Sequence, residues 1–198
     1  MRQTRKSGSM ADKKRLIVGM SGASGAPLAV EVLRQLRESG DVEAHLIVTQ
    51  GAMLTLRQET DISPGELYGM ADAVYDPQSI GAAPASGSFK TIGMIVVPCS
   101  MKTVAGIVSG YSDNLLLRAA DVTLKERRRL VLAARESPLS TVHLRNLHEA
   151  SMLGAVIMPP VPAFYRHPGS VDDCVRHMAG RMLEQFGICA EGYEWTGM

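Results

Sequence analysis

The sequence predicts an α/β domain in three layers, α/β/α, with a parallel β-sheet between two layers of helices. Short apolar runs rich in β-branched residues alternate with helical patterns along the chain. Near-continuous apolar runs are typical of parallel strands, because these strands are covered on both faces. A length of 198 residues suits one domain with a full core. We expect this domain at residues 13–189, between a disordered tail at 1–12 and a C-terminal tail at 190–198.

The expected strands are the five most apolar runs. They lie at 15–20, 44–49, 94–99, 129–134 and 154–159. Helical patterns predict helices at about 26–38, 50–58, 64–71, 101–109, 113–127, 143–152 and 170–186. The third helix has a clear start, because Ser63-Pro64-Gly65-Glu66 combines a capping box with proline in the first turn. Residues 76–89, rich in Gly, Pro, Ala and Ser, are expected to form a long loop.

Composition excludes several classes of partner. The formal net charge is +1, which gives no electrostatic footprint for nucleic acid, and no apolar run is long enough to span a membrane. Cys99, Cys174 and Cys189 share no CxxC spacing, so we expect reduced thiols in a cytoplasmic protein, with Cys99 in the core. The five histidines lack metal-ligand spacing. Asp172-Asp173 lacks the third acidic residue of a magnesium motif and is better interpreted as helix N-terminal charge. No metal is expected.

The glycine-rich stretch GMSGASGAP, Gly19–Pro27, follows the first strand. It lacks the Gly-Lys-Ser/Thr ending of a Walker loop, which removes the main signature of nucleotide triphosphate hydrolysis. Ser21 stands where a dinucleotide fingerprint needs glycine, and the second strand ends in Thr49-Gln50 rather than near an acidic residue, so NAD binding is a weaker alternative. The hydroxyls of Ser21 and Ser24 suit a phosphate or a heterocycle edge. A tight turn with a capping serine fits equally well.

A second turn of the same kind is PCSMKT, residues 98–103. It places Ser100, Lys102 and Thr103 at the positive end of a helix. Ligands of open parallel sheets bind beyond the carboxyl ends of the strands. Two such turns on neighbouring strands therefore predict one phosphate-bearing ligand that contacts both.

The helix expected at 113–127 is apolar nearly all round, which predicts burial. Arg118, Asp121 and Lys125 nevertheless lie on one stripe of it. A solvated face with a weak ion pair is the ordinary interpretation. On a buried helix, the stripe also suits an anionic ligand or an interface.

Further charged residues lie near the strand ends. Arg135 and Glu136 follow the fourth strand, where a cation beside a carboxylate suits phosphate recognition with proton transfer; a surface pair is the alternative. Glu59 ends the second helix and is equally consistent with a solvated residue.

The proline-rich segment 159–168 is expected to be stiff and extended. It would hold Tyr165 so that the phenol donates to a ligand, or pack it under the loop. Arg181 in the last helix is a candidate for an anion or a solvent-facing residue.

The motifs GMSGASGA, ETD, PCSMKT, RAADVTLKERR, RES, GAVIMPPVPAFYRHP and SVDD occur in this order. Together they resemble the UbiX-type flavin prenyltransferases from about residue 14 to 188. The resemblance implies a flavodoxin-like, Rossmann-like fold that binds reduced FMN. It also implies transfer of a dimethylallyl group from dimethylallyl monophosphate to the flavin, giving the prenylated FMN used by UbiD-type decarboxylases. A homododecamer with sites between subunits is implied as well.

The same resemblance implies roles for individual residues. FMN would be contacted by Gly22, Ala23, Ser24, Thr49, Ser100, Met101, Lys102, Thr103 and Arg135. The prenyl phosphate would be held by Arg118, Lys125, Tyr165 and Arg181. The residues expected to be catalytic are Ser24, Glu59, Lys125 and Glu136. Among these, Glu136 would protonate the departing phosphate, and Glu59 would take the proton released when the flavin is alkylated.

Two other functions remain as alternatives. Flavin-dependent cysteine decarboxylases are similar in fold, but they use a catalytic histidine and a PASANT segment whose asparagine is replaced here by Lys102. A non-catalytic FMN carrier subunit would explain the glycine turns, but it would not explain the stripe that carries Arg118 and Lys125.

Overall fold

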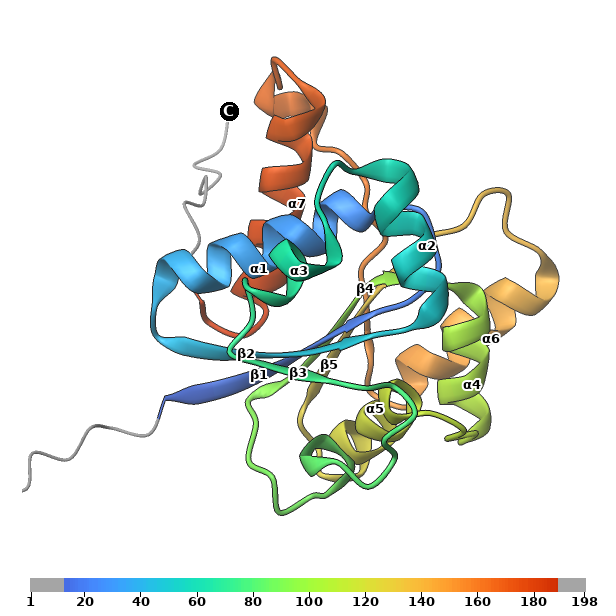
Figure 1. The fold of residues 1–198 in the computed structure, drawn as a ribbon. Helices are drawn as coiled ribbons and strands as arrows, with labels where there is room; N and C mark the ends of the chain where they lie inside the picture. The colour runs from blue at the N-terminus through green and yellow to red at the C-terminus, as the bar shows by residue number, and fades with distance from the viewer. Residues whose placement is uncertain (1–12, 189–198) are drawn as a thin grey trace, which may run out of the picture.

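The computed structural model describes residues 13–188 and confirms the three-layer α/β fold (Figure 1). Its strands are β1 (Lys14–Met20), β2 (Val42–Val48), β3 (Ala73–Tyr75), β4 (Gly93–Cys99), β5 (Arg129–Ala134) and β6 (Val156–Ile157). They form one parallel sheet in the order β3-β2-β1-β4-β5-β6. Without the short edge strand β3, this is the flavodoxin-like order, in which ligands bind where the strand order reverses. That point lies between β1 and β4.

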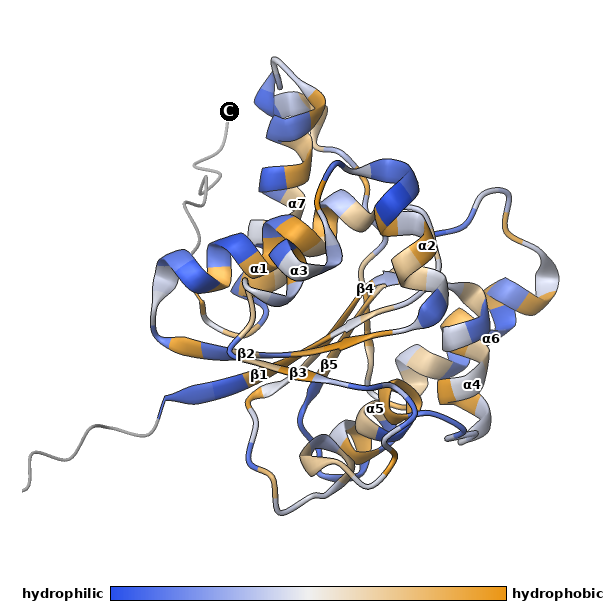
Figure 2. Ribbon diagram, in the orientation of Figure 1, coloured by the Kyte–Doolittle hydropathy of each residue, from blue (hydrophilic) through white to orange (hydrophobic). Residues whose placement is uncertain are grey.

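The helices cover both faces of the sheet, as Figure 1 shows. One layer contains α1 (Ala26–Ser39), α2 (Gln50–Glu59), α3 (Pro64–Tyr68) and α7 (Val171–Glu184). The other contains α4 (Met101–Ser109), α5 (Leu115–Lys125) and α6 (Thr141–Met152). Side chains alternate across β1, so that Leu16 and Val18 join the first core and Ile17 joins the second. Hydrophobic residues accordingly line the strands and the inner faces of the helices in Figure 2.

The predicted elements agree with the structure apart from a few differences. β3 was not predicted, because three residues at an edge carry too little pattern. β6 is shorter than expected, and α3 ends at Tyr68. The long loop contains a short 3₁₀ helix, η1 (Ala83–Ala85). The Arg128 guanidinium holds this loop by donating to the carbonyl oxygens of Gly87 at 2.6 Å and Phe89 at 2.8 Å.

Several local expectations are confirmed. Ser63 and Glu66 form the capping box of α3. Ser170 caps α7. Asp172 and Asp173 lie in its first turn, where their negative charges interact favourably with the positive end of the helix dipole. Cys99 is buried. No helix within residues 13–188 is long and apolar enough to cross a membrane. The two predicted tails and Cys189 lie outside the described residues.

Gly93, at the start of β4, is required by the sheet itself. Its φ is +148°, and a Cβ atom there would lie 2.2 Å from the carbonyl oxygen of Arg129 and 2.6 Å from the Phe186 ring. We predict that Gly93→Ala lowers the free energy of unfolding by about 2–4 kcal/mol, through backbone strain and overpacking. Denaturant unfolding would measure this.

The matched control is Gly65→Ala, because a Cβ there meets nothing within 4 Å. It should change the free energy of unfolding by no more than about 0.5–1 kcal/mol. Equal effects of the two substitutions would contradict the account of Gly93.

Candidate functional site

The two predicted turns meet at the carboxyl edge of the sheet. Ser21, after β1, is buried, and its hydroxyl donates to the Pro98 carbonyl at 2.9 Å and accepts from the Ser100 amide at 2.7 Å. The prediction that neighbouring strands carry both turns is confirmed by the pairing of β1 with β4. The expectation that the Ser21 hydroxyl faces a ligand is wrong, because two backbone groups inside the protein already engage it. Ser21 joins the turns, and Ser24, which is exposed, faces outward.

The N-terminus of α1 is occupied by a carboxylate of the same chain. Glu59, at the end of α2, accepts the amide protons of Gly25 and Ala26, each at 2.8 Å, and a hydrogen bond from the Ser24 side chain. Helix N-termini attract anions because their first amides lack partners in the helix. This turn therefore leaves no free pair of amides for a phosphate at Gly25 and Ala26. These hydrogen bonds fix the Glu59 carboxylate at the N-terminus of α1.

Glu59 is ionised at neutral pH. Burial raises the pKa of its carboxyl, but the hydrogen bonds from Gly25, Ser24 and Ala26 outweigh burial. The positive charge of Arg135 acts in the same direction, and the net result is a pKa below the ordinary value. Residues from the ends of β1, α2 and β5 thus form one electrostatic group, although they are far apart in the sequence.

The turns after β1 and β2 approach each other backbone to backbone. A Cβ on Gly22 would lie 3.1 Å from the Gly51 backbone, and a Cβ on Gly51 would lie 3.2 Å from the Cα of Gly22. Thr49 caps α2 by accepting from the Ala52 amide at 3.3 Å. Ala23 is buried. A Cβ at either position would be closer than ordinary van der Waals contact, so the two backbones would have to separate by a few tenths of an ångström.

The turn after β4 opens α4. Ser100 caps the helix by accepting from the Thr103 amide at 3.3 Å, and the two hydroxyls lie 3.1 Å apart. Met101 and Thr103 are buried. Lys102 is exposed and lines a groove of about 450 Å³ together with Asn146 of α6. Because the Ser100 hydroxyl takes the Thr103 amide, the amides of Met101 and Lys102 are the ones at this helix end that suit an anion.

Tyr165 and Arg181 are brought together at a separate pocket of about 200 Å³. Its walls combine the polar groups of Tyr165, His177 and Arg181 with apolar side chains, which include three methionines and two prolines: Met158, Met178, Met182, Pro159 and Pro160. The sequence predicts an extended backbone throughout residues 159–168, and this is wrong in part. Tyr165 lies in a 3₁₀ helix, η2 (Phe164–Arg166). Arg181 pairs with Glu184. A pocket that combines apolar side chains with a phenol and a guanidinium suits a short hydrocarbon attached to an anion.

The cationic stripe on α5 lies in the other helical layer. Arg118 pairs with Asp121 at 2.5 Å, and Lys125 pairs with Glu126 at 2.6 Å, as on an ordinary half-exposed face. The helix itself is buried on its apolar sides, as predicted. Because α5 and α7 cover opposite faces of the sheet (Figure 1), one chain does not bring Lys125 and Arg181 together. A site that uses both needs a second copy of the chain.

Arg135 and Glu136 lie beyond β5 and are both exposed. The Arg135 amide donates to the Cys99 carbonyl at 3.0 Å, which ties the end of β5 to the end of β4. Glu136 accepts from the Ser137 amide at 3.0 Å. The pair is therefore at the predicted edge of the sheet, with its charged groups open to a ligand or to another subunit.

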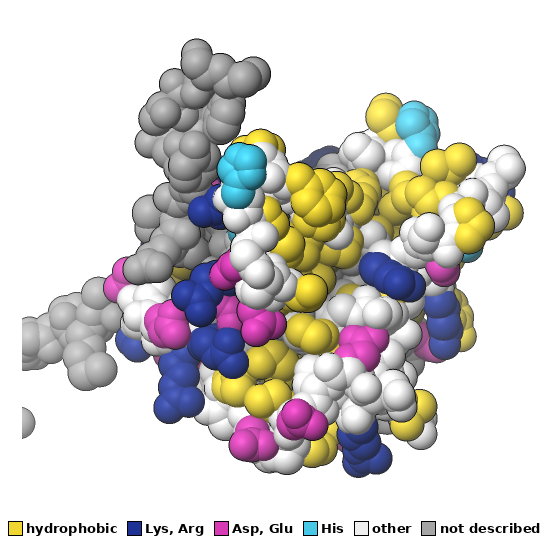
Figure 3. All heavy atoms as spheres, turned by 90° about the horizontal axis from the view of Figure 1, so that it is seen from above, with side chains coloured by type: hydrophobic (Ala, Val, Ile, Leu, Met, Phe, Trp, Pro, Cys, Tyr) yellow, Lys and Arg dark blue, Asp and Glu magenta, His cyan; other side chains and the backbone are white. Residues whose placement is uncertain are grey.

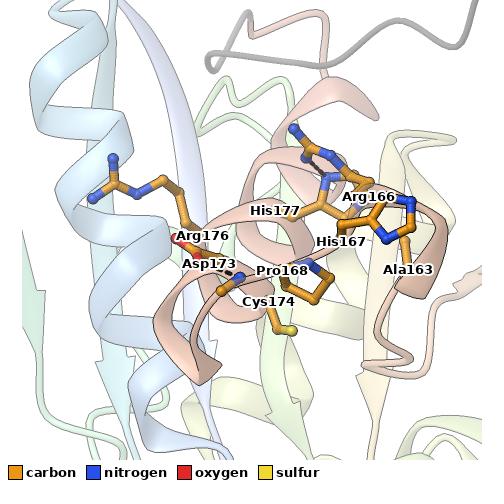
Figure 4. A pocket seen from close by; sticks show the side chains of 9 residues that line it. Ala163, Arg166, His167, Pro168, Asp173, Cys174, Arg176 and His177 are labelled. Atoms are coloured by element: carbon orange, nitrogen blue, oxygen red, sulfur yellow. Dashed lines mark hydrogen bonds between the residues drawn. The ribbon is translucent and has the colours of Figure 1, made fainter.

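Two residues that the sequence analysis did not select lie beside the Tyr165 pocket. Arg166 of η2 is hydrogen-bonded to His177 of α7 (Figure 4), and His177 lines the same pocket as Tyr165 and Arg181. His177 precedes Arg181 by one helical turn, and that spacing is the signal by which it could have been found.

Comparisons with known proteins show the family to which the chain belongs. The model of the Flavoprotein family matches residues 4–180. Flavin prenyltransferase UbiX of Escherichia coli (strain K12) is 54% identical over 175 residues, which are 88% of this chain and 93% of that protein. The crystal structure of AnUbiX (PadA1) in complex with FMN and dimethylallyl pyrophosphate superposes with a TM-score of 0.92 at 49% identity, covering 94% of this chain and all of that one (100%).

Two further structures separate the alternatives. A dodecameric FMN-dependent Ubix-like decarboxylase from Escherichia coli O157:H7 has a TM-score of 0.90 at 51% identity and covers 93% of this chain and 100% of its own. The FMN-dependent cysteine decarboxylase TvaF has a TM-score of 0.62 at 16% identity, covering 82% of this chain and 99% of its own. The second likeness shows a common fold alone.

Proposed function

Because the chain belongs to the Flavoprotein family, as one of its UbiX-type flavin prenyltransferases, we propose that it transfers a dimethylallyl group from dimethylallyl monophosphate to reduced FMN. The observation that carries this function is the 54% identity to flavin prenyltransferase UbiX over 93% of that protein. The chain is thus an enzyme, and FMN is its flavin.

The residues at the strand ends fit FMN. Gly22 and Gly51 let the turns after β1 and β2 approach closely, and Gly22 follows β1, one of the two strands that flank the switch point of the sheet. Since Glu59 occupies the amides of α1, the FMN phosphate is proposed to bind elsewhere, near the first amides of α4 and the Arg135 guanidinium. Residues proposed to contact the flavin are Gly22, Ala23, Ser24, Thr49, Ser100, Met101, Lys102 and Thr103.

The pocket of Tyr165 and Arg181 fits the prenyl phosphate. Its methionines offer an adaptable apolar surface for a five-carbon chain, and its polar groups offer donors to phosphate. Arg118 and Lys125 are proposed to reach the same phosphate from another subunit. Guanidinium and ammonium groups neutralise the charge that develops as the carbon–oxygen bond breaks, so the reaction is proposed to need no metal.

Reduced FMN, when bound, supplies an electron-rich ring as the acceptor of the allylic group. The protein orients this acceptor and excludes water from the developing cation. Glu136 is proposed to protonate the departing phosphate. Ser24 lies between the exposed face of the turn and the Glu59 carboxylate, so a proton released at the flavin is proposed to pass through the Ser24 hydroxyl to Glu59.

Assembly completes the site. The face in Figure 3 shows many hydrophobic side chains at the surface, and the segment around Tyr165 exposes Val161 (70%), Phe164 (74%) and Val171 (78%). Such patches mark protein interfaces. We propose a homododecamer, like the dodecameric relative from Escherichia coli O157:H7. Its product is proposed to serve a UbiD-type decarboxylase in the cytoplasm, where free thiols such as Cys99 and Cys174 stay reduced.

The function is tested by mass. Purified protein is incubated under anaerobic conditions with reduced FMN and dimethylallyl monophosphate, in the presence or absence of a chelator. The molecular mass of the flavin is then measured by mass spectrometry. We expect the flavin to gain one five-carbon unit in both cases. Unchanged flavin would contradict the proposal and favour an FMN carrier, whereas loss of carbon dioxide from a cysteine-terminated peptide would favour the cysteine decarboxylase.

A further inference from the structure

A hydrogen bond between Arg166 and His177 joins two walls of the Tyr165 pocket. η2 carries Tyr165, and its next residue, Arg166, is bonded to His177 of α7. Figure 4 shows these two side chains facing each other, whereas Arg176 points to the opposite side of α7. His177 also lines the pocket together with Tyr165 and Arg181. The His177 imidazole, which lies on the same helix as Arg181, therefore contacts the segment that holds the phenol.

The partners of His177 require its neutral form. A guanidinium has donors only, so the Nδ1 atom that faces Arg166 must accept, and the ring proton must lie on Nε2. Burial lowers the pKa of His177, and the charges of Arg166 and Arg181 lower it further. Glu184 opposes them but is itself paired with Arg181. The imidazole is thus neutral at physiological pH.

The other titratable groups near His177 do not replace this bond. His167 and Cys174 line the cavity on the η2 side. Asp173 accepts from the Gly169 amide at 3.0 Å and so closes the first turn of α7. Within residues 13–188, the charged groups that act on His177 are two cations, Arg166 and Arg181, and one carboxylate, Glu184.

We propose that His177 is a positioning residue for the prenyl phosphate: as a neutral acceptor it holds Arg166, and with it the Tyr165 segment, against Arg181. This inference rests on the proposed function of the pocket. When His177 gains a proton, Nδ1 becomes a donor that faces a donor, and the contact with Arg166 is lost. The affinity for the prenyl phosphate then falls as the pH falls, although the site gains a positive charge. The proposed FMN site, at the other strand ends, is unaffected.

The test compares three variants with the wild-type protein from pH 8 down to the lowest pH at which the wild type stays folded. His177→Asn keeps an acceptor and cannot titrate, His177→Leu has no acceptor, and His167→Asn is the matched control for a neighbouring imidazole. The measurements are kcat and KM for dimethylallyl monophosphate and the affinity for FMN. The substrate phosphate titrates near pH 6, and this changes KM equally for every variant. Dividing each KM by the KM of His177→Asn at the same pH therefore cancels the effect of substrate ionisation.

At pH 8 we expect His177→Asn to stay near the wild type, and His177→Leu to raise KM roughly tenfold, as for the loss of a hydrogen bond to a charged group, with kcat changed less and FMN affinity unchanged. At the acid end of this range, where His177 gains its proton, the wild type and His167→Asn should both show a KM several-fold above that of His177→Asn. If His177→Leu fails to fold, the low-pH comparison alone decides.

Wild-type and His177→Asn profiles that run parallel, or a wild type that binds the prenyl phosphate better at low pH, would overturn the role of His177 while leaving the prenyltransferase activity in place. Unchanged KM in a folded His177→Leu would do the same. Absence of prenylation by the wild type at every pH would overturn the proposed function and this inference together.

Discussion

Replacement of Glu59 by glutamine is expected to slow flavin prenylation by at least about 100-fold, the contribution typical of a positioned base, while FMN still binds. The glutamine oxygen can still accept the amide protons of Gly25 and Ala26, which Glu59 accepts at 2.8 Å, so the α1 turn keeps its shape. The negative charge and the ability to take a proton are lost. Single-turnover measurement of flavin mass at saturating prenyl phosphate separates this loss from weaker binding.

The pH dependence of the Glu59 step follows from its pKa, which lies below the ordinary value of a glutamate. A base acts in its ionised form, so Glu59 stays competent as the pH falls until the medium reaches that lowered pKa. We therefore expect no loss of the chemical step that is attributable to Glu59 between pH 8 and about 5. An acid limb near pH 6.5 in single-turnover rates would contradict this assignment.

Glu66→Gln is the matched control. Glu66 is also a carboxylate whose pKa is lowered, by hydrogen bonds from the Ser63 side chain and amide, but it lies in the capping box of α3. Its replacement should leave prenylation unchanged. Equal losses for Glu59→Gln and Glu66→Gln would mean that the effect is one of general stability. Ser24→Ala should lose activity in the same direction as Glu59→Gln, because the proton is proposed to pass through its hydroxyl.

The order of elements could be predicted from the sequence because each apolar run is long enough to show its period. β3 could not, since Ala73–Tyr75 is too short to distinguish an edge strand from a loop. The two turns were located correctly from glycine, serine and strand ends. The inward role of Ser21 was not, because a hydroxyl in a turn can face a ligand or a neighbouring strand, and only the pairing of β1 with β4 decides.

The site itself is less predictable than the fold, because its contacts link distant segments. Glu59 meets Gly25 across 34 positions of the sequence, and no local pattern indicates that contact. Arg118 and Lys125 share a stripe that the sequence defines well, but the layer to which their helix belongs follows from the topology of the sheet. The resemblance to a family supplied the roles of these residues, and the structure supplies the reason why one chain cannot fulfil them all.

Mixed assemblies are expected to recover activity that each parent lacks. Lys125→Ala and Arg181→Ala should each reduce kcat/KM by at least roughly 100-fold, since each removes a charge-assisted contact that is proposed to hold the phosphate. In a site that takes α5 from one chain and α7 from another, random co-assembly of the two variants leaves about a quarter of the sites with both cations intact. Co-expression with two different affinity tags, followed by sequential purification, gives the mixed particles to assay.

The control mixes two single variants whose substitutions both lie on α5. Chains with Lys125→Ala and chains with Arg118→Ala each supply a defective α5, so no combination of them builds an intact site, and co-assembly should recover nothing. Recovery by the first pair without recovery by the second requires that α5 and α7 act from different chains, as their positions on opposite faces of the sheet demand. Failure of the first pair to recover would mean that one chain supplies both cations, which this fold does not permit without rearrangement.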